Sequence, residues 1–150
     1  MIIELNLMGF QDQLRVKHEN DRQLIFDSIR HKWLVLQPEE LVRQLLVQYL
    51  LNEKGYSKNK IALEKLLIIN NLERRYDILV YNADTSPFML IECKAPNIDI
   101  TDDTFRQIAQ YNLSLNVPYL LVTNGIKTYC CRMDYTQKSY EFLPGIPNPH

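Results

Sequence analysis

The chain has 150 residues, of which 46% are hydrophobic and 23% charged, and its formal net charge is −1. This composition excludes a disordered protein and predicts one domain, residues 1–150, that buries its core without disulfides or a structural metal. The near-neutral charge argues against a strongly basic, free-standing nucleic-acid binder, although it leaves a local basic surface open. The candidates for such a surface are Lys54, Lys58, Lys60, Arg74 and Arg75.

The three cysteines do not have the spacing of a disulfide framework or a zinc site, because Cys130 and Cys131 are adjacent and Cys93 lies in an apolar run. An odd set of this kind suggests a reducing compartment. The N-terminus lacks the pattern of a signal peptide, and no stretch approaches the about 18 consecutive apolar residues of a membrane span. We therefore expect a cytoplasmic protein without a membrane partner.

The N-terminal region contains three short β-like segments, at residues 13–18, 23–28 and 32–36. Polar residues 19–22 separate the first two segments as a turn would. The region therefore predicts an N-terminal β-hairpin or meander.

A helix is predicted from Pro38 onward. Pro38 suits a first helical turn, Glu39 and Glu40 favour the positive end of the helix dipole, and Gly55 stands where a helix ends. The apolar residues between them form one broad face, so we expect about four turns that pack on a core.

The rest of the chain alternates strand and helix signals. Residues 61–69 fit a strand or a helix on pattern alone, and their β-branched ends favour a strand. Thr101 can cap a second helix that has Asp102 and Asp103 in its first turn and runs through residue 115, and Asn124 with Gly125 forms a turn signal between apolar segments. The expected strands are at residues 61–69, 76–81, 87–93, 118–123, 127–133 and 140–143. This order predicts an α/β fold, with a mixed central sheet flanked by helices.

Charged residues mark the ends of the hairpin formed by the second and third of these strands. A symmetric hairpin places Asp77 opposite Glu92, and Tyr81 opposite Phe88. Strand periodicity then puts Glu92 and Lys94 on one face, about 7 Å apart, with Asp77 on the same face. Two carboxylates and one ammonium would therefore converge.

Carboxylates at this separation repel each other, so we expect a cation between Asp77 and Glu92. Mg²⁺ typically takes one or two protein carboxylates and several waters, and Mn²⁺ would serve similarly. Such an ion polarises a phosphodiester and activates water, while Lys94 would hold that water or stabilise charge on the phosphoryl group. From spacing alone, a salt bridge that merely caps the strand ends is an equal alternative.

The order of Glu40, Asp77, Glu92 and Lys94 resembles the PD-(D/E)xK nuclease superfamily, and in particular the N-terminal nuclease-like domain of type I restriction enzyme R subunits. The matching stretches cover roughly residues 30 to 130, which is far more specific than Glu-Cys-Lys alone. They are PEELVRQLL (38–46), RRYDILVY (74–81), LIECKAP (90–96), QIAQYN (107–112) and LLVTNG (120–125). The resemblance implies a restriction-endonuclease-like fold.

The resemblance also implies roles for individual residues. Asp77 and Glu92 would be metal ligands, with the backbone carbonyl of Cys93 as a further one, and Lys94 would be the catalytic lysine. Glu40 would be an additional acid near the site. The remaining implied site residues are Gln107 and Tyr111, a Gln-x-x-x-Tyr pair that would border the site and contact substrate or support the metal.

The chain departs from the pattern at Tyr76, which stands where the superfamily name has proline. That proline shapes the entry to the strand and is not a catalyst. Glu64, on the preceding strand, is a possible extra site residue, although a solvated carboxylate is the better interpretation.

The resulting hypothesis is a Mg²⁺-dependent DNA endonuclease. We find no G-x-x-x-x-G-K-[ST] phosphate loop, so a motor, and specificity or methylation subunits, would be separate partners or parts of a longer chain. One alternative is a nuclease-fold DNA-binding or assembly module that cleaves little by itself. A second alternative is a protein whose acidic cluster is only structural.

Overall fold

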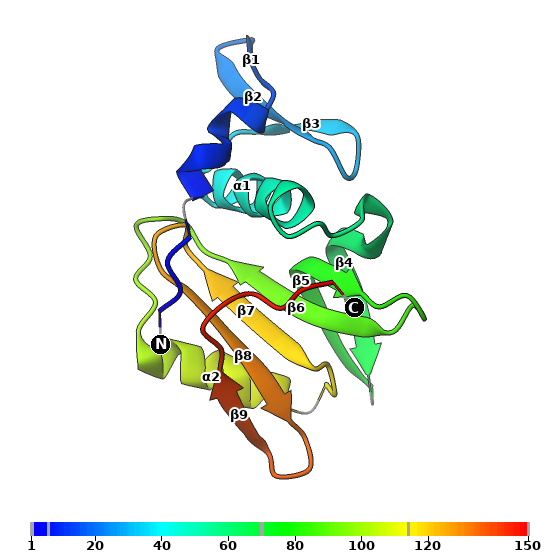
Figure 1. Ribbon diagram of the computed structural model, residues 1–150. Coiled ribbons are helices and arrows are strands. Elements are labelled where there is room, and N and C mark those ends of the chain that lie inside the picture. The colour runs from blue at the N-terminus through cyan, green and yellow to red at the C-terminus, as the bar shows by residue number, and fades with distance from the viewer. Residues whose placement is uncertain (1, 6, 70, 114, 150) are drawn as a thin grey trace.

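The computed structural model describes residues 2–5, 7–69, 71–113 and 115–149 (Figure 1). Two α-helices and nine strands make up most of these residues, together with two short 3₁₀ segments. The helices are α1 (Pro38–Asn52) and α2 (Asp102–Asn112), and the 3₁₀ segments are η1 (Leu7–Gln13) and η2 (Lys58–Lys60). The strands are β1 (Val16–Glu19), β2 (Arg22–Asp27), β3 (Lys32–Val35), β4 (Ile61–Ile69), β5 (Leu72–Tyr81), β6 (Pro87–Cys93), β7 (Tyr119–Thr123), β8 (Thr128–Asp134) and β9 (Ser139–Phe142).

The main sheet has six strands in the order β4-β5-β6-β7-β8-β9. Neighbouring strands are antiparallel except β6 and β7, which run parallel because the chain crosses over through α2 between them. The predicted mixed central sheet flanked by helices is therefore confirmed. Within the described residues, no helix is long and apolar enough to span a membrane.

The N-terminal meander is also confirmed, because β1, β2 and β3 form a separate three-stranded antiparallel sheet. The 3₁₀ segment η1, which precedes it, was not predicted. Leu7 at the start of η1 is only 1% exposed and packs into the core against α1. This N-terminal segment is thus part of the main body of the protein.

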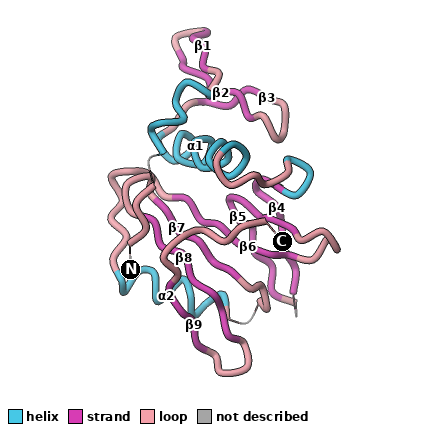
Figure 2. The backbone as a smooth tube through the Cα atoms, viewed as in Figure 1, coloured by secondary structure: helices cyan, strands magenta, loops and turns pink. Residues whose placement is uncertain are grey.

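Helix α1 lies between the two sheets (Figures 1 and 2). It begins at Pro38 as predicted, and Gly55 follows its end with a φ of +77°. Six consecutive residues of α1, residues 42–47, are buried, which is more than one amphipathic face can bury. The helix is therefore covered on more than one side.

Two apolar clusters cover the two faces of the main sheet. One cluster includes Leu46 of α1 and Ile91 of β6, and the other includes Phe105 of α2 and Leu90 of β6. Adjacent residues of β6 thus face opposite helices, as strand periodicity requires. Thr101 caps α2 by accepting the backbone N–H of Thr104 at 3.1 Å.

Helix α2 ends at Asn112, earlier than the predicted residue 115. The Asn112 side chain is buried, donates to the Ile108 carbonyl at 2.8 Å, and accepts the hydroxyl of Tyr76. Tyr76, the residue in the place of the superfamily proline, therefore ties the end of α2 to β5.

The hairpin of β5 and β6 keeps most of its predicted register. Ile78 pairs with Ile91 and Val80 with Met89, in the alignment that puts Asp77 across from Glu92. The prediction that Tyr81 pairs with Phe88 is wrong. A bulge between residues 80 and 81 shifts Tyr81 onto Pro87.

Candidate active site

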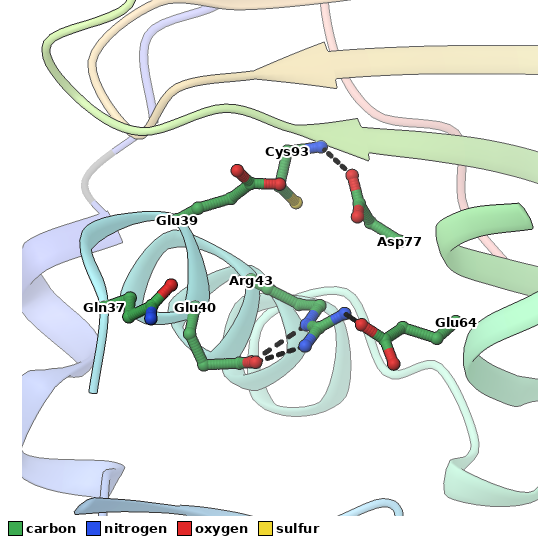
Figure 3. Close-up of a pocket in the computed structure, with 7 residues that line it drawn as sticks. All are labelled: Gln37, Glu39, Glu40, Arg43, Glu64, Asp77 and Cys93. Atoms are coloured by element: carbon green, nitrogen blue, oxygen red, sulfur yellow. Dashed lines mark hydrogen bonds and ion pairs between the residues drawn. The ribbon is translucent and has the colours of Figure 1, made fainter. Parts of the chain in front are cut away.

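A polar pocket of about 220 Å³ opens between α1 and the strands β4, β5 and β6 (Figure 3). Its lining includes four carboxylates and one guanidinium. The lining residues, which we call the acidic pocket, are Gln37, Glu39, Glu40, Arg43, Glu64, Asp77 and Cys93. One helix and three strands therefore meet here.

Helix α1 supplies the acidic pocket with residues of its first two turns. Arg43 lies one turn after Glu40, and its Nε donates to the Glu40 carboxylate at 2.8 Å while Nη2 donates to the second carboxylate oxygen. Gln44 donates to the same carboxylate at 3.0 Å. The predicted site residue Glu40 thus lies in the pocket, with its charge balanced by Arg43.

Arg43 also reaches β4, where Nη1 lies 3.2 Å from a carboxylate oxygen of Glu64. Burial lowers the pKa of Arg43, but Glu40 and Glu64 outweigh burial and raise it above its ordinary value. Burial raises the pKa of Glu64, yet Arg43 and Arg30 lower it overall. Glu64 is therefore an exposed strand carboxylate, as predicted, that also lines the pocket and pairs with Arg43 and Arg30.

Asp77 enters the pocket because the alternation of side chains between the two faces of the sheet is interrupted beside it. Leu63 and Leu67 of β4 are four residues apart, yet they pack on opposite faces of the sheet. Glu64, which lies between them, has a φ of +53°. The strand pairing of β4 with β5 continues on both sides of Glu64, but Glu64 and Asp77, which would face each other, are not paired. The left-handed residue kinks both strands and turns Asp77 toward α1.

The Asp77 carboxylate then reaches across to β6. Its Oδ2 accepts the backbone N–H of Cys93 at 2.7 Å. Burial raises the pKa of Asp77, and so do the nearby carboxylates of Glu39 and Glu92. The Cys93 N–H and Arg43 lower it, but the pKa is raised overall. The ionised carboxylate of Asp77 would therefore be stabilised by a cation bound beside it.

The prediction that Asp77 and Glu92 share one face of the sheet is wrong. Glu92 alternates with Ile91 and Cys93, which pack on the α1 side, so its side chain leaves β6 on the α2 side. There its carboxylate forms an ion pair with Arg74. The kink at Asp77 is the physical reason, since an unbroken β5 would have directed both acids to the α2 side.

Lys94 follows β6 directly, and its backbone N–H donates to the Thr123 carbonyl at 2.8 Å. This bond fixes the start of its side chain at the end of the parallel β6–β7 pair. The side chain is partly exposed, and within the described part of the chain no ion pair of its ammonium is recorded. The salt bridge of Glu92 at the end of β6 is therefore formed with Arg74 instead of Lys94.

The Gln-x-x-x-Tyr pair lies on α2, where Tyr111 contacts Arg74. The Tyr111 ring is 50% exposed and lies 4.3 Å from the guanidinium carbon of Arg74. Gln107 is exposed on the same helix. The Cys93 thiol is buried against the acidic pocket, where burial and Asp77 raise its pKa well above its ordinary value.

Three residues of this region were not predicted as site residues. They are Arg43, Glu39 and Arg74; Glu39 was expected only to favour the positive end of the helix dipole, and Arg74 only to contribute to a basic surface. The signals that could have found them are the i, i+3 spacing of Glu40 and Arg43, and an arginine three residues before Asp77.

The oxygen-rich donor set fits a hard divalent cation in part. Within the described residues, no three acidic, histidine or cysteine side chains gather as a complete chelating group. Mg²⁺ needs fewer protein ligands, because one or two carboxylates and several waters complete its shell. Asp77 is placed for this role, and Glu92 becomes available only if Arg74 releases it and its carboxylate turns from the α2 side toward Asp77.

The comparison with protein families identifies the family of the chain. The family model described as type I restriction enzyme R protein N terminus matches residues 38–147. The three-stranded N-terminal sheet precedes the matched residues. No curated protein matches the chain.

Among solved structures, the chain is similar to a fragment of an HsdR subunit of a type I restriction enzyme from Vibrio vulnificus YJ016. The two sequences are 21% identical, and the TM-score is 0.50. The match covers 75% of this chain and 24% of the other, so this chain spans about a quarter of that structure. At this identity the similarity concerns the fold.

Proposed function

Because the chain belongs to the family of type I restriction enzyme R protein N termini, we propose that it is a metal-dependent DNA endonuclease domain of the PD-(D/E)xK type. The observation that supports this most is the 2.7 Å bond from the Cys93 N–H to Asp77. This bond holds the Asp77 carboxylate against the backbone of Cys93, the residue directly after Glu92.

Asp77 and the Cys93 carbonyl would hold Mg²⁺ or Mn²⁺, and Glu92 would join them if its carboxylate left Arg74 and turned around the end of β6 toward Asp77. When bound, the ion supplies the polarisation of the scissile phosphate and the activation of water. The acidic pocket favours cation binding, because Glu39, Glu40, Glu64 and Asp77 outnumber Arg43.

The chain's own residues orient the substrate. Lys94 would place its ammonium against the attacking water or the scissile phosphate, and its anchored backbone limits where that charge can lie. Tyr111 and Gln107 are exposed on α2, from which they would contact the DNA. Motor, specificity and methylation subunits of a restriction system are the expected partners.

A second candidate is a DNA-binding or assembly module that does not cleave by itself. The ion pair of Glu92 with Arg74 favours it, because a carboxylate held by arginine is not free to bind a metal. The two candidates differ in whether a divalent metal alone produces cleavage.

The test is DNA nicking by the purified chain in Mg²⁺ or Mn²⁺, compared with Lys94→Ala. We expect nicking by the wild type and a loss of about a hundredfold or more in the variant, because a fixed charge at the reacting phosphate is removed. Lys65→Ala, which removes an exposed strand lysine, is the matched control and should cleave like the wild type.

Thermal unfolding checks that Lys94→Ala remains folded. Equal cleavage by the wild type and Lys94→Ala would remove Lys94 from the proposed mechanism. DNA retention without cleavage in any divalent metal would favour the binding module instead.

A further inference from the structure

Glu92 is a nearly buried acid whose partner in this structure is an arginine. Its side chain is 10% exposed, and that of Arg74 is 26% exposed. An isolated carboxylate at this depth would be costly, so Glu92 requires a cation beside it. Arg74 is that cation here, since its Nη2 donates directly to the Glu92 Oε1.

Arg74 is held from a second direction by aromatic rings. Its guanidinium carbon lies 4.3 Å from the centre of the Tyr111 ring and 5.4 Å from that of Tyr76. Stacking on a ring leaves the edge of a guanidinium able to donate hydrogen bonds. The tyrosines therefore hold Arg74 beside Glu92 from a second direction.

A metal ion and Arg74 cannot both bind the same oxygen of Glu92. If Glu92 is a metal ligand, as in the proposed function on which this inference rests, the guanidinium has to leave and the Glu92 carboxylate has to turn around the end of β6 toward Asp77 before the metal coordinates both acids. Arg74 then needs another anion. A phosphate of DNA matches the planar donors of arginine, and Arg74 lies beside Tyr111 on the exposed side of α2.

We propose that Arg74 couples metal binding to DNA binding: without DNA it occupies Glu92 and keeps the site closed to Mg²⁺, and with DNA it moves to a backbone phosphate and frees Glu92 for the metal. Arg74 is thus a positioning residue that restricts metal loading to the DNA-bound protein. By linkage, DNA and metal should each raise the affinity of the protein for the other.

The first experiment measures Mn²⁺ binding to the full chain by calorimetry without DNA. If the Arg74–Glu92 ion pair is formed in about ten molecules for each one in which it is broken, the apparent affinity for the metal falls about tenfold. We therefore expect Arg74→Ala to bind Mn²⁺ about tenfold more tightly than the wild type. Arg75→Ala, which removes the same charge from an exposed neighbouring position, should bind like the wild type.

The second experiment adds a short DNA duplex in a Lys94→Ala background, so that the DNA is not consumed. The duplex should raise Mn²⁺ affinity when Arg74 is present, and should have little effect when residue 74 is alanine. Arg74→Lys keeps the charge but cannot bind in the same planar way, so it should give a several-fold gain without DNA. It also carries the test if Arg74→Ala does not fold.

The outcomes separate this inference from the proposed function. Equal Mn²⁺ affinity of the wild type and the Arg74 variants, with cleavage intact, would overturn the coupling role and leave the nuclease in place. Absence of Mn²⁺ binding in all variants, with and without DNA, would overturn the metal-dependent function itself, and the coupling role with it.

Discussion

The buried Asp27 and the half-buried Asp77 have opposite electrostatic environments. Asp27 accepts the backbone N–H groups of Ile29 and Arg30, each at 2.9 Å, and the Arg30 Nε at 2.6 Å. Burial raises the pKa of Asp27, but these donors outweigh it and lower the pKa overall. For Asp77 burial dominates, and the pKa is raised. Asp27 thus stabilises the fold at neutral pH, whereas the Asp77 carboxylate opposes it.

Substitution of each aspartate by asparagine should therefore have opposite effects at neutral pH. Asp77→Asn removes an ionised group from an acidic setting, so we expect unchanged or increased stability together with loss of Mn²⁺ binding. Asp27→Asn loses charged hydrogen bonds, and we expect a loss of about 1–3 kcal/mol. Urea unfolding at about pH 7 and about pH 3 measures both effects.

The pH dependence follows from the direction of each pKa. The contribution of Asp27 is present above the ordinary aspartate pKa and lost as pH falls through its lowered value, so the deficit of Asp27→Asn should shrink in acid. The cost of Asp77 appears as pH rises above the ordinary value, so any gain in Asp77→Asn should shrink in acid too. A large loss of stability in Asp77→Asn at neutral pH would contradict this account.

At the scale of elements, the turn between β7 and β8 brings the sheet against α1. Asn124 orders the turn, since its side chain accepts the N–H groups of Ile126 at 2.9 Å and Lys127 at 2.7 Å. Gly125 has a φ of +89°, and a Cβ there would lie 3.3 Å from a methyl group of Val42. The turn therefore requires glycine both for its backbone and for the close approach to α1.

Gly125→Ala should destabilise the protein by about 1–3 kcal/mol, because the left-handed backbone is strained and Val42 has to move. Urea unfolding measures the loss. Gly145→Ala is the matched control, since no atom lies within 4 Å of its added Cβ, and it should change little. Equal stability of the two variants would show that α1 can shift away from the turn.

At the scale of the whole molecule, the N-terminal residues complete the core even though the family match begins at residue 38. The Ile3 N–H donates to the Thr128 carbonyl of β8 at 2.7 Å, and both Ile3 and Leu7 pack with α1. The chain before α1 thus bridges the main sheet and the helix. We infer that the matched region alone would expose apolar surface of α1.

Leu7→Ala should lower the free energy of unfolding by about 2–5 kcal/mol, as for other buried leucines. Ile2→Ala, at a side chain that is 48% exposed, should stay within about 0.5 kcal/mol of the wild type. Thermal or urea unfolding distinguishes them. A small effect of Leu7→Ala would mean that η1 packs as an independent appendage.

The order of elements was predictable because the relevant signals are local. Pro38 at the start of α1, Thr101 as the cap of α2 and the Asn124–Gly125 turn each act within a few residues. The order of acids and lysine around them carried the family resemblance, which the match over residues 38–147 confirms. The sequence by itself therefore determined the class of fold and the family.

The direction of the site side chains was decided only by the tertiary structure. The kink at Glu64 turns Asp77 to the α1 side, and it depends on the pairing of two strands and on two arginines, Arg30 and Arg43, that bind Glu64. Similarly, the pairing of Arg74 with Glu92 across two strands depends on the packing of α2. Strand periodicity assumes an unbroken ladder, and long-range charge pairs that break the ladder leave no local signal in the sequence.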